Sequence, residues 1–493
     1  MLTLLSLVLV LALGLLQPTP VCALTGQQIA FALQAELSSG SEVVLTSNTS
    51  AYPAKNFTPR YNIATPPTYT VAVKPALAVD VQKVVQYALH NNASFLATGS
   101  GHGYSTSLDR LQAGIDLDLG FFNSIEIDTV AKTMTIGGSV SSNDLASALQ
   151  AAGMEATLGQ CGCIGYPGAS LGGGIGPYSG LYGPMSDSLL SAEIITGRGQ
   201  LLNVSSTQHP DLFYGLKGAG FNFGVATSLT YRIYPATNGG NAMLAQMIFP
   251  GALNQSVWQI VSNFTASNQP KELAIGLDAR YVAAMGGMVV MANFIYIGPQ
   301  SAGMKVIQPF LDLKPANLNI STVAWADIPF KAFYGGIAEG GCTAGAYYVP
   351  HSLNLYQIDV PNLVEVFNYM NKTLATNEVL QGVAIAMQQY AQYGFQLQDA
   401  KTSAWPYRDV VSFVQIDGVA TNPSQLPAVG KYGRKIRDRL HHGSGRKDLQ
   451  TYVHFANGNE SPAALYSAAK LPGLRALKRE YDPARLFSWY NPI

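Results

Sequence analysis

The chain has 493 residues, of which 48% are hydrophobic and only 12% are charged, and its 29 Lys and Arg balance its 29 Asp and Glu. Soluble domains usually carry about 25% charged residues. The apolar content excludes a disordered chain, and the zero net charge argues against a nucleic-acid-binding protein, because no positive field would collect phosphates. A membrane protein is the first class to test, and glycine is unusually abundant with 49 residues.

A single segment is apolar enough to enter a bilayer. Residues 2–16 are almost entirely Leu, Val and Ala, and they are followed by Gln17, Pro18, Pro20 and the small-residue stretch 21–23. This pattern predicts a secretory signal peptide over 1–23, since its apolar core is shorter than the ~20 residues that a membrane span needs. An uncleaved anchor is the alternative. No later stretch is comparable, so we expect a soluble mature chain with no membrane partner.

Nine Asn-x-Ser/Thr sequons also favour export. They begin at Asn48, Asn56, Asn92, Asn203, Asn254, Asn263, Asn319, Asn371 and Asn459. Glycans at such sites would solubilise a surface that is poor in charge. The sequence therefore predicts a secreted, N-glycosylated protein.

Three cysteines remain after the predicted cleavage: Cys161, Cys163 and Cys342. An odd number in a secreted protein requires either a free thiol or a sulfur bonded to something other than cysteine. Cys161 and Cys163 are poorly placed to bridge each other, because one residue separates them. A disulfide between Cys163 and Cys342 stays an open alternative.

Short helices and strands alternate irregularly over 24–235. In chain order we expect a helix over 26–37, a strand at 71–73, an amphipathic helix opened by Pro75 and Asp80, strands at 94–98 and 114–119, a hairpin of 124–128 with 132–137, a helix over 142–152 capped by Asn143 or Ser142, a hairpin of 189–196 with 200–204, a helix over 211–216 and a strand over 224–234. This order predicts an α+β fold.

A second domain is predicted after a linker at 236–241. Strands are expected at 243–249, 288–296 and 410–416, with helices at 253–265, 304–311 and 363–374. The pattern predicts an antiparallel sheet covered by helices on one face. The basic run 431–447, with His441 and His442, is interpreted as a solvated helix and loop. No metal site is predicted.

Two glycine-rich segments have the composition of ligand-binding loops. The first, 98–104, directly follows a predicted strand, and the second is 159–176. The first segment does not have the spacing of a dinucleotide-binding fingerprint, whose third glycine would stand at Tyr104, or that of a Walker loop. Glycines let backbone N–H groups approach an anionic ligand closely, although tight structural turns are the alternative. His102 and Cys161 lie one in each segment, which suggests a ligand held at two points.

With these motifs the chain resembles the secreted FAD-linked oxidoreductases of the vanillyl-alcohol-oxidase type, and in particular their berberine-bridge-enzyme-like branch. In that family a Gly-His pair, matched by Gly101-His102, carries the flavin 8α carbon on the histidine. A Gly-x-Cys-x-x-(Val/Ile)-Gly loop, matched by 159–165, bonds flavin C6 through the cysteine, here Cys161. Residues 211–225 and the 481–487 stretch Tyr-Asp-Pro-Ala-Arg-Leu-Phe resemble two further family motifs.

The resemblance implies FAD bound covalently at His102 and Cys161, which leaves Cys163 and Cys342 to pair or to remain thiols. It implies four parts: the signal peptide 1–23, a two-part PCMH-type FAD-binding domain over 24–235, a substrate domain over 236–446, and a segment 447–493 that returns to the FAD domain. The implied cofactor-binding residues are Thr98, Gly99, Ser100, Gly101, His102, Gly103, Gly159, Cys161, Ile164, Gly165, Gly168, Gly172, Gly173, Gly176, Gly224, Val225, Tyr490 and Asn491.

The catalytic base is the point of departure from the family. Many members use a tyrosine near the C-terminus, and Phe455 stands at the matching position. Phenylalanine cannot accept a proton, so Tyr452 and His454, which share one face of a predicted strand, are the substitute candidates. Ile164 stands where a β-branched residue resembles that of oxygen-using oxidases.

We therefore expect a monomeric secreted oxidase that transfers a hydride from a small-molecule alcohol, of the secondary-metabolite kind, to FAD. O2 is the expected electron acceptor and H2O2 the product. The alternatives are a carbohydrate oxidase that forms lactones, a flavoprotein cyclase with little net redox turnover, and a glycoprotein without enzymatic activity.

Overall fold

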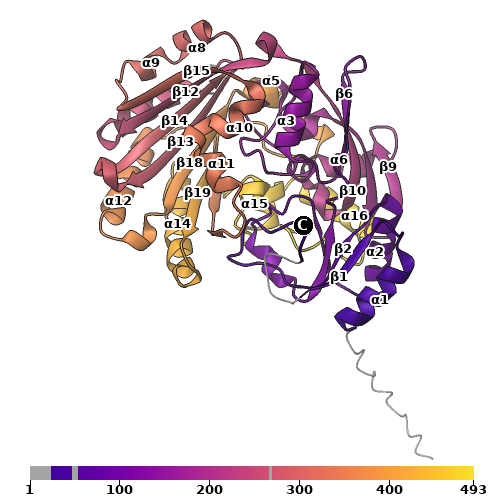
Figure 1. Cartoon of the computed structure of the whole chain (residues 1–493). Coiled ribbons are helices and arrows are strands. Elements are labelled where there is room, and N and C mark those ends of the chain that lie inside the picture. Colours follow the sequence, from indigo (N-terminus) through magenta and orange to yellow (C-terminus); the bar gives the residue numbers. More distant parts are fainter. Residues whose placement is uncertain (1–23, 47–53, 266–268) are drawn as a thin grey trace, which may run out of the picture.

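The computed structural model describes residues 24–46, 54–265 and 269–493. The predicted signal peptide and the sequon at Asn48 lie outside these ranges. Within them, every helix is too short or too polar to cross a bilayer. Three large β-sheets and one two-stranded sheet organise the described chain (Figure 1).

The first sheet has four strands in the order β1-β2-β4-β3. Strands β2, β4 and β3 run parallel, and β1 pairs antiparallel with β2 at the other edge. Helix α2 connects β2 to β3, and α1 begins at a capping box formed by Thr25 and Gln28. The bounds are α1 (Gly26–Glu36), β1 (Glu42–Leu45), β2 (Tyr69–Lys74), α2 (Ala78–Asn91), β3 (Phe95–Thr98) and β4 (Gly114–Asp118).

The second sheet has five antiparallel strands in the order β5-β6-β10-β8-β9. Both predicted hairpins, β5 with β6 and β8 with β9, belong to it. The helix predicted at 142–152 is α3, but its cap is Ser141, whose hydroxyl accepts from the Asp144 N–H. The bounds are β5 (Ile125–Asp128), β6 (Thr133–Gly137), α3 (Ser142–Ala151), β7 (Met154–Glu155), α4 (Tyr166–Leu171), α5 (Ser179–Tyr182), β8 (Leu189–Thr196), β9 (Leu201–Ser205), α6 (Pro210–Ala219), β10 (Gly224–Arg232) and β11 (Tyr234–Pro235).

The third sheet is antiparallel, with strands in the order β15-β12-β14-β13-β18-β19-β16 and with β17 also paired to β19. Helices α7, α12 and α14 pack on one face, and Figure 1 shows α12 and α14 along the outer side. An antiparallel sheet covered by helices was predicted and is confirmed. The bounds are β12 (Asn241–Pro250), α7 (Asn254–Asn263), β13 (Leu273–Val282), β14 (Gly287–Tyr296), β15 (Asn317–Ala324), β16 (Tyr347–Tyr348), β17 (His351–Leu355), α12 (Val360–Leu374), β18 (Val383–Tyr390), β19 (Ser412–Ala420) and α14 (Leu426–His441).

One prediction for this region needs correction. The helix predicted at 304–311 is divided into α8 (Gln300–Val306) and α9 (Gln308–Leu311), because Pro309 has no N–H to continue the hydrogen-bond ladder. The helix and loop predicted for the basic run are confirmed, and α14 exposes Lys431, Arg434 and Lys435 on one side. Its other side buries Val429, Ile436 and Leu440 against the sheet.

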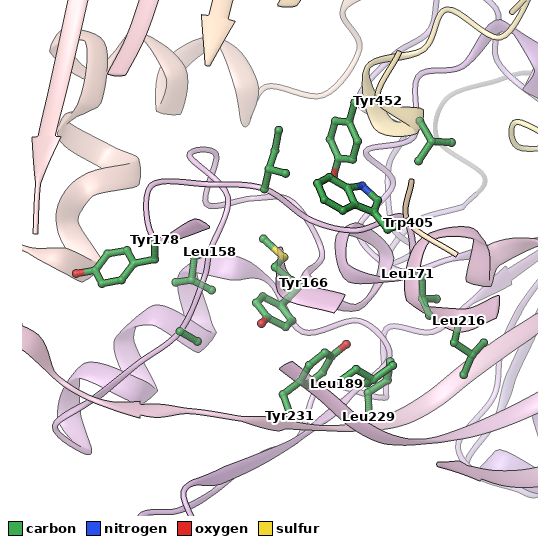
Figure 2. Close-up of a cluster of buried hydrophobic side chains, with 14 of the residues drawn as sticks. Leu158, Tyr166, Leu171, Tyr178, Leu189, Leu216, Leu229, Tyr231, Trp405 and Tyr452 are labelled. Atoms are coloured by element: carbon green, nitrogen blue, oxygen red, sulfur yellow. The ribbon is translucent and has the colours of Figure 1, made fainter. Parts of the chain in front are cut away.

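The C-terminal segment packs against the second sheet and its helices. Helices α15 (Pro462–Tyr466) and α16 (Leu471–Tyr481) contribute to the same hydrophobic cluster as Tyr166, Tyr231 and Trp405 (Figure 2). Lys478 of α16 donates to the backbone carbonyls of Asn222 and Phe487 and to the Asp482 carboxylate. This buried cation therefore ties the chain end to the turn that precedes β10.

The strand predicted around 451–457 is wrong. Val453–Phe455 form a 3₁₀ helix, closed by a 2.9 Å hydrogen bond from the Phe455 N–H to the Tyr452 carbonyl. Tyr452 and His454 do not share a strand face, although their rings meet edge to face with centroids 5.4 Å apart.

Candidate active site

A cavity of about 570 Å³ opens where the three sheets and the C-terminal segment meet. One wall is built from the end of β3, the two glycine-rich loops and the beginning of β10. The opposite wall is the face of the third sheet that the helices leave uncovered. Residues 452–455 and 487–490 close a third side. The cavity therefore collects residues that are far apart in the sequence.

The two glycine-rich loops are joined directly. The Gly165 N–H donates to the Ser100 hydroxyl at 2.6 Å. Gly101 has a φ of +72°, and a Cβ added there would overlap the Pro59 carbonyl, so this position excludes any side chain. The loops form one continuous wall along which a ligand would meet backbone atoms.

His102 lies in this wall with its ring stacked on Tyr61, the centroids 4.8 Å apart and the planes 11° apart. Burial, assisted by the nearby positive charge of Arg60, lowers the pKa of His102 to about 4. The imidazole is therefore neutral at neutral pH and keeps a lone pair on one ring nitrogen. Such a nitrogen can attack an electrophilic carbon of a bound ligand.

Cys161 presents a half-buried free thiol to the same cavity. Burial raises the pKa of this thiol, while N–H groups of Cys163 and Ile164 donate to the sulfur. Cys163 and Cys342 form a disulfide with their Cα atoms 5.5 Å apart, which resolves the alternative that the sequence left open. Within the described chain, Cys161 is the one cysteine available for another bond.

Most of the predicted cofactor-binding residues line the cavity. They are Thr98, Gly99, Ser100, Gly101, His102, Gly103, Cys161, Ile164, Gly165, Gly168, Gly224, Val225 and Tyr490. Gly159, Gly172, Gly173, Gly176 and Asn491 lie outside its lining.

The residues outside the lining support the wall from behind. A Cβ on Gly173, whose φ is +115°, would approach the Trp405 indole to 2.5 Å, and one on Gly172 would overlap His454. Figure 2 shows Trp405 and Tyr452 above this part of the core. Asn491 accepts from Ser105 and donates to the Val453 carbonyl. These residues serve close packing and chain positioning.

Arg60, which the sequence analysis did not identify, is a buried positive charge at the site. It is 4% exposed, lines the cavity, and donates to the Gly103 carbonyl at 2.6 Å. Its Nε has no hydrogen-bond partner, and none of the ion pairs in the described part of the chain includes it. A buried cation without a counter-charge is costly, so this arrangement suits an anionic ligand.

The third sheet contributes polar side chains to an otherwise apolar surface. Across β13, β18 and β19, Asp278, Ala386 and Gln415 lie opposite one another, and all three line the cavity. Asp278 is paired with Arg280, two residues along the same face, through two hydrogen bonds. Alternate residues such as Leu277 and Val414 point into the core beneath the helices. Period-two alternation thus places Asp278, Arg280 and Gln415 on the cavity side.

Asp417 is the titratable group of this wall that the sequence reasoning missed. The Tyr348 hydroxyl donates to its carboxylate, and the Gln415 amide donates in turn to that hydroxyl and to Tyr104. Burial, with the nearby charge of Asp278, raises the pKa of Asp417 to about 6. The available signal was the pair of polar residues, 415 and 417, on one face of an apolar strand.

The two candidate bases named from the sequence also line the cavity. The Tyr452 hydroxyl accepts from the Gly174 N–H at 2.9 Å, and burial raises its pKa well above the usual range. His454 Nε2 donates to the Ala169 carbonyl at 2.9 Å, and burial lowers its pKa to about 4. Phe455 lines the cavity beside them and carries no proton acceptor.

Comparison with known proteins identifies related sequences. Residues 69–205 match the family described as an FAD binding domain. The chain is 33% identical over 475 residues to the FAD-linked oxidoreductase azaL of Aspergillus niger, covering 96% of this chain and 99% of that protein. It is 32% identical over 434 residues to the FAD-linked oxidoreductase tazL of Aspergillus terreus, covering 88% of each.

Solved structures show the same fold at low sequence identity. The glucooligosaccharide oxidase of Acremonium strictum superposes with a TM-score of 0.81 at 17% identity, over 95% of this chain and 98% of that one. The BBE-like 1 protein of Physcomitrella patens superposes with a TM-score of 0.79 at 18% identity, over 94% and 98%. The likeness extends through all three sheets.

Proposed function

Because the chain belongs to the FAD-linked oxidoreductases, we propose that it is a secreted oxidase of a small-molecule alcohol, with FAD bonded to His102 and Cys161. The observation that carries the proposal is that one cavity holds both a neutral histidine and a free thiol, on two loops joined by the Ser100–Gly165 hydrogen bond. Stacking on Tyr61 holds the His102 ring at the cavity, and Cys161 takes no part in the Cys163–Cys342 disulfide.

The residues of the cavity fit FAD. Gly101 has a positive φ and packs against the Pro59 carbonyl, and this turn lets the first loop present backbone N–H groups to a pyrophosphate. Arg60, buried and without a carboxylate partner, matches the negative charge that this group brings. His102 and Cys161 would hold the flavin ring, which supplies the redox chemistry by accepting a hydride from the alcohol carbon.

The proton of the substrate hydroxyl requires an acceptor in the wall. Asp417 suits this role better than the two groups named from the sequence, because a base is most effective when its pKa lies near the working pH. Its pKa of about 6 compares with about 4 for His454. The Tyr348 hydroxyl, which donates to Asp417, would relay the proton from the substrate to the carboxylate. The roles of Tyr452 and His454 stay predictions.

Electron transfer to O2 with release of H2O2 is the proposed second half of the reaction. Ile164 supports this part, since the residue lines the cavity and its β-branched side chain resembles that of oxygen-using family members. Stopped-flow mixing of the dithionite-reduced protein with air tests it. We expect reoxidation within seconds and one H2O2 per flavin. A reduced flavin that persists for minutes in air would exclude the oxidase.

A carbohydrate oxidase is the second candidate, favoured by the several hydrogen-bonding groups of the sheet wall, which include Gln388, Gln415 and the Asp278–Arg280 pair. The apolar residues Met291, Phe333 and Ile337 of the same lining favour a less polar substrate. Anaerobic mixing with aryl alcohols and, separately, with cello-oligosaccharides distinguishes them. Flavin bleaching by the alcohols alone supports the proposal, and bleaching by the sugars alone overturns this substrate class.

Secretion and N-glycosylation complete the proposal. Asn56, Asn92, Asn203, Asn263, Asn319, Asn371 and Asn459 are exposed, as glycan acceptors must be. Asn254 is 7% exposed and donates to the Gly251 carbonyl, so this sequon is a poor acceptor, contrary to the sequence reading. Peptide mass analysis after glycosidase treatment tests these sites. Asn254 should remain unmodified, and finding no glycan at any site would contradict the proposal.

A further inference from the structure

One segment of the third-sheet region crosses the cavity instead of packing into a core. Residues 332–345, here called the cap segment, contain the short helix α11 (Gly336–Gly341) after α10 (Ile328–Lys331). Phe333, Gly336, Ile337 and Gly341 of this segment line the cavity. None of the residues of α11 is buried. The cap segment is therefore held by its ends and not by packing of its helix.

The first end of the cap segment is a left-handed turn. Phe333 and Tyr334 have φ values of +52° and +56°, which are unusual for large side chains and cost stability. Buried side chains of the third sheet hold the turn: Asn293 Oδ1 accepts from the Phe333 N–H, and Gln246 Oε1 accepts from the Tyr334 N–H. These hydrogen bonds from the sheet hold the turn in the conformation that places the Phe333 ring at the cavity wall.

Space for that ring is provided by a glycine in β13. A Cβ on Gly276 would approach Phe333 Cζ to 2.9 Å, so the ring lies directly on the backbone of the strand. Gly276 shares the cavity-side face of β13 with Asp278. The ring of Phe333 therefore stands beside the polar groups that would receive a substrate.

The second end of the cap segment is fixed covalently. Cys342 directly follows α11 and is bonded to Cys163, two residues from Cys161. The next residues are held by backbone hydrogen bonds from Gly345 and Ala346 to the Tyr61 carbonyl. A Cβ on Gly341 would approach the Cys161 sulfur to 2.8 Å. The disulfide thus fastens α11 against the loop that carries the proposed flavin-binding thiol.

We propose that Phe333 and Ile337 determine the size of the substrate that the cavity accepts, and that the Cys163–Cys342 disulfide holds them in place. The inference rests on the proposed function for the identity of the substrate. The strained turn, the glycine seat for Phe333 and the covalent fastening of α11 all act on the same two side chains. Without the disulfide, α11 would have no buried residue to keep Ile337 over the cavity.

Two truncations test the selectivity. Benzyl alcohol and the larger 2-naphthalenemethanol are mixed anaerobically with the flavin-loaded protein at a series of concentrations. Dissociation constants are read from the concentration dependence of the flavin reduction rate or, where the flavin stays oxidised, from the equilibrium shift of its absorbance. In Phe333→Ala and in Ile337→Ala we expect the preference for the larger alcohol to rise about tenfold, as expected when apolar bulk is removed from a pocket. The matched control, Phe330→Ala, removes an exposed ring outside the cavity lining and should leave the ratio unchanged.

The disulfide is tested by the double variant Cys163→Ala/Cys342→Ala. Cleavage by Glu-C protease after Glu339, a residue of α11, should become at least about tenfold faster than in the wild type, because local opening sets the rate of proteolysis. The alcohol preference should shift in the same direction as in Ile337→Ala.

The outcomes separate this inference from the proposed function. If neither alcohol bleaches the flavin but the binding ratios shift as described, the size-selecting role of Phe333 and Ile337 is supported. The proposed oxidation of such alcohols is then contradicted. Unchanged ratios in both truncation variants, or no binding of either alcohol by any variant, overturn the size-selecting role. An unchanged cleavage rate in the double variant overturns the fastening role of the disulfide.

Discussion

Replacing Asp417 by asparagine tests which group accepts the substrate proton. The amide has nearly the same volume and can still accept the hydrogen bond from Tyr348, but it cannot take up a proton. General-base catalysis typically contributes about 10²–10⁴-fold to the rate. We therefore expect the rate of flavin reduction in Asp417→Asn to fall by about that factor, with the flavin still bound.

The pH dependence of kcat/KM in the wild type gives a second quantitative test of Asp417 as the base. A base must be ionised, so activity is lost as the pH falls through its pKa. With a pKa of about 6 for Asp417, about nine-tenths of the carboxyl groups are ionised at about pH 7 and about one-tenth at about pH 5. The value of kcat/KM should therefore drop about tenfold between these conditions. If His454 were the base, its pKa of about 4 would leave kcat/KM nearly constant over the same interval.

Anaerobic stopped-flow reduction of the flavin by an alcohol substrate, across a pH series, is the assay. His454→Gln and Tyr452→Phe are the matched controls, since each removes one sequence-derived candidate. The reasoning about Asp417 is refuted if the wild-type profile is flat down to about pH 5, or if Asp417→Asn reduces its flavin at the wild-type rate while either control loses it.

Three further predictions concern cofactor binding and stability. Arg60→Met should be purified with little or no FAD, and Arg60→Lys with an intermediate amount, as measured by the absorbance ratio of flavin to protein; full occupancy in Arg60→Met would contradict the anion-binding role. Gly101→Ala should also lose FAD and be less stable by at least ~1 kcal/mol, because the position has a positive φ and the added Cβ would overlap Pro59. A variant with the wild-type FAD occupancy and the wild-type thermal midpoint would contradict this. Lys478→Met should lower the free energy of unfolding by about 3–5 kcal/mol in chemical denaturation, since it leaves Asp482 buried without its cation, and a loss below ~1 kcal/mol would show that the pair is not required.

The sequence was informative wherever a signal is local. The amphipathic pattern of α2, the hairpin of β5 with β6, and the glycine-rich loops are all determined by neighbouring residues, and the structure has these elements near their predicted places. The Gly-His pair and the Gly-x-Cys loop similarly predicted that His102 and Cys161 share one site, and both residues line one cavity. Composition alone could not have predicted this.

Features that depend on distant contacts were missed or misassigned. Residues 451–457 alternate like a strand, but they have no strand partner, and the hydroxyl of Tyr452 instead accepts from Gly174. Gly172 and Gly173 were assigned to the ligand because glycine density alone does not distinguish a ligand from protein side chains, here His454 beside Gly172 and Trp405 beside Gly173. Arg60 and Asp417 gain their character only from burial, which is set by segments hundreds of residues away along the chain.

Peptide mapping of the denatured protein tests directly whether one FAD is bonded to both His102 and Cys161. The purified protein is unfolded, freed of unbound ligands by gel filtration, digested, and analysed by absorbance and mass. We predict that the yellow colour stays with the chain and that a single flavin cross-links the peptide containing His102 to the peptide containing Cys161, while Cys163 and Cys342 appear as a disulfide. Complete release of the flavin on unfolding, or a flavin-free Cys161 found in another disulfide, would contradict the account.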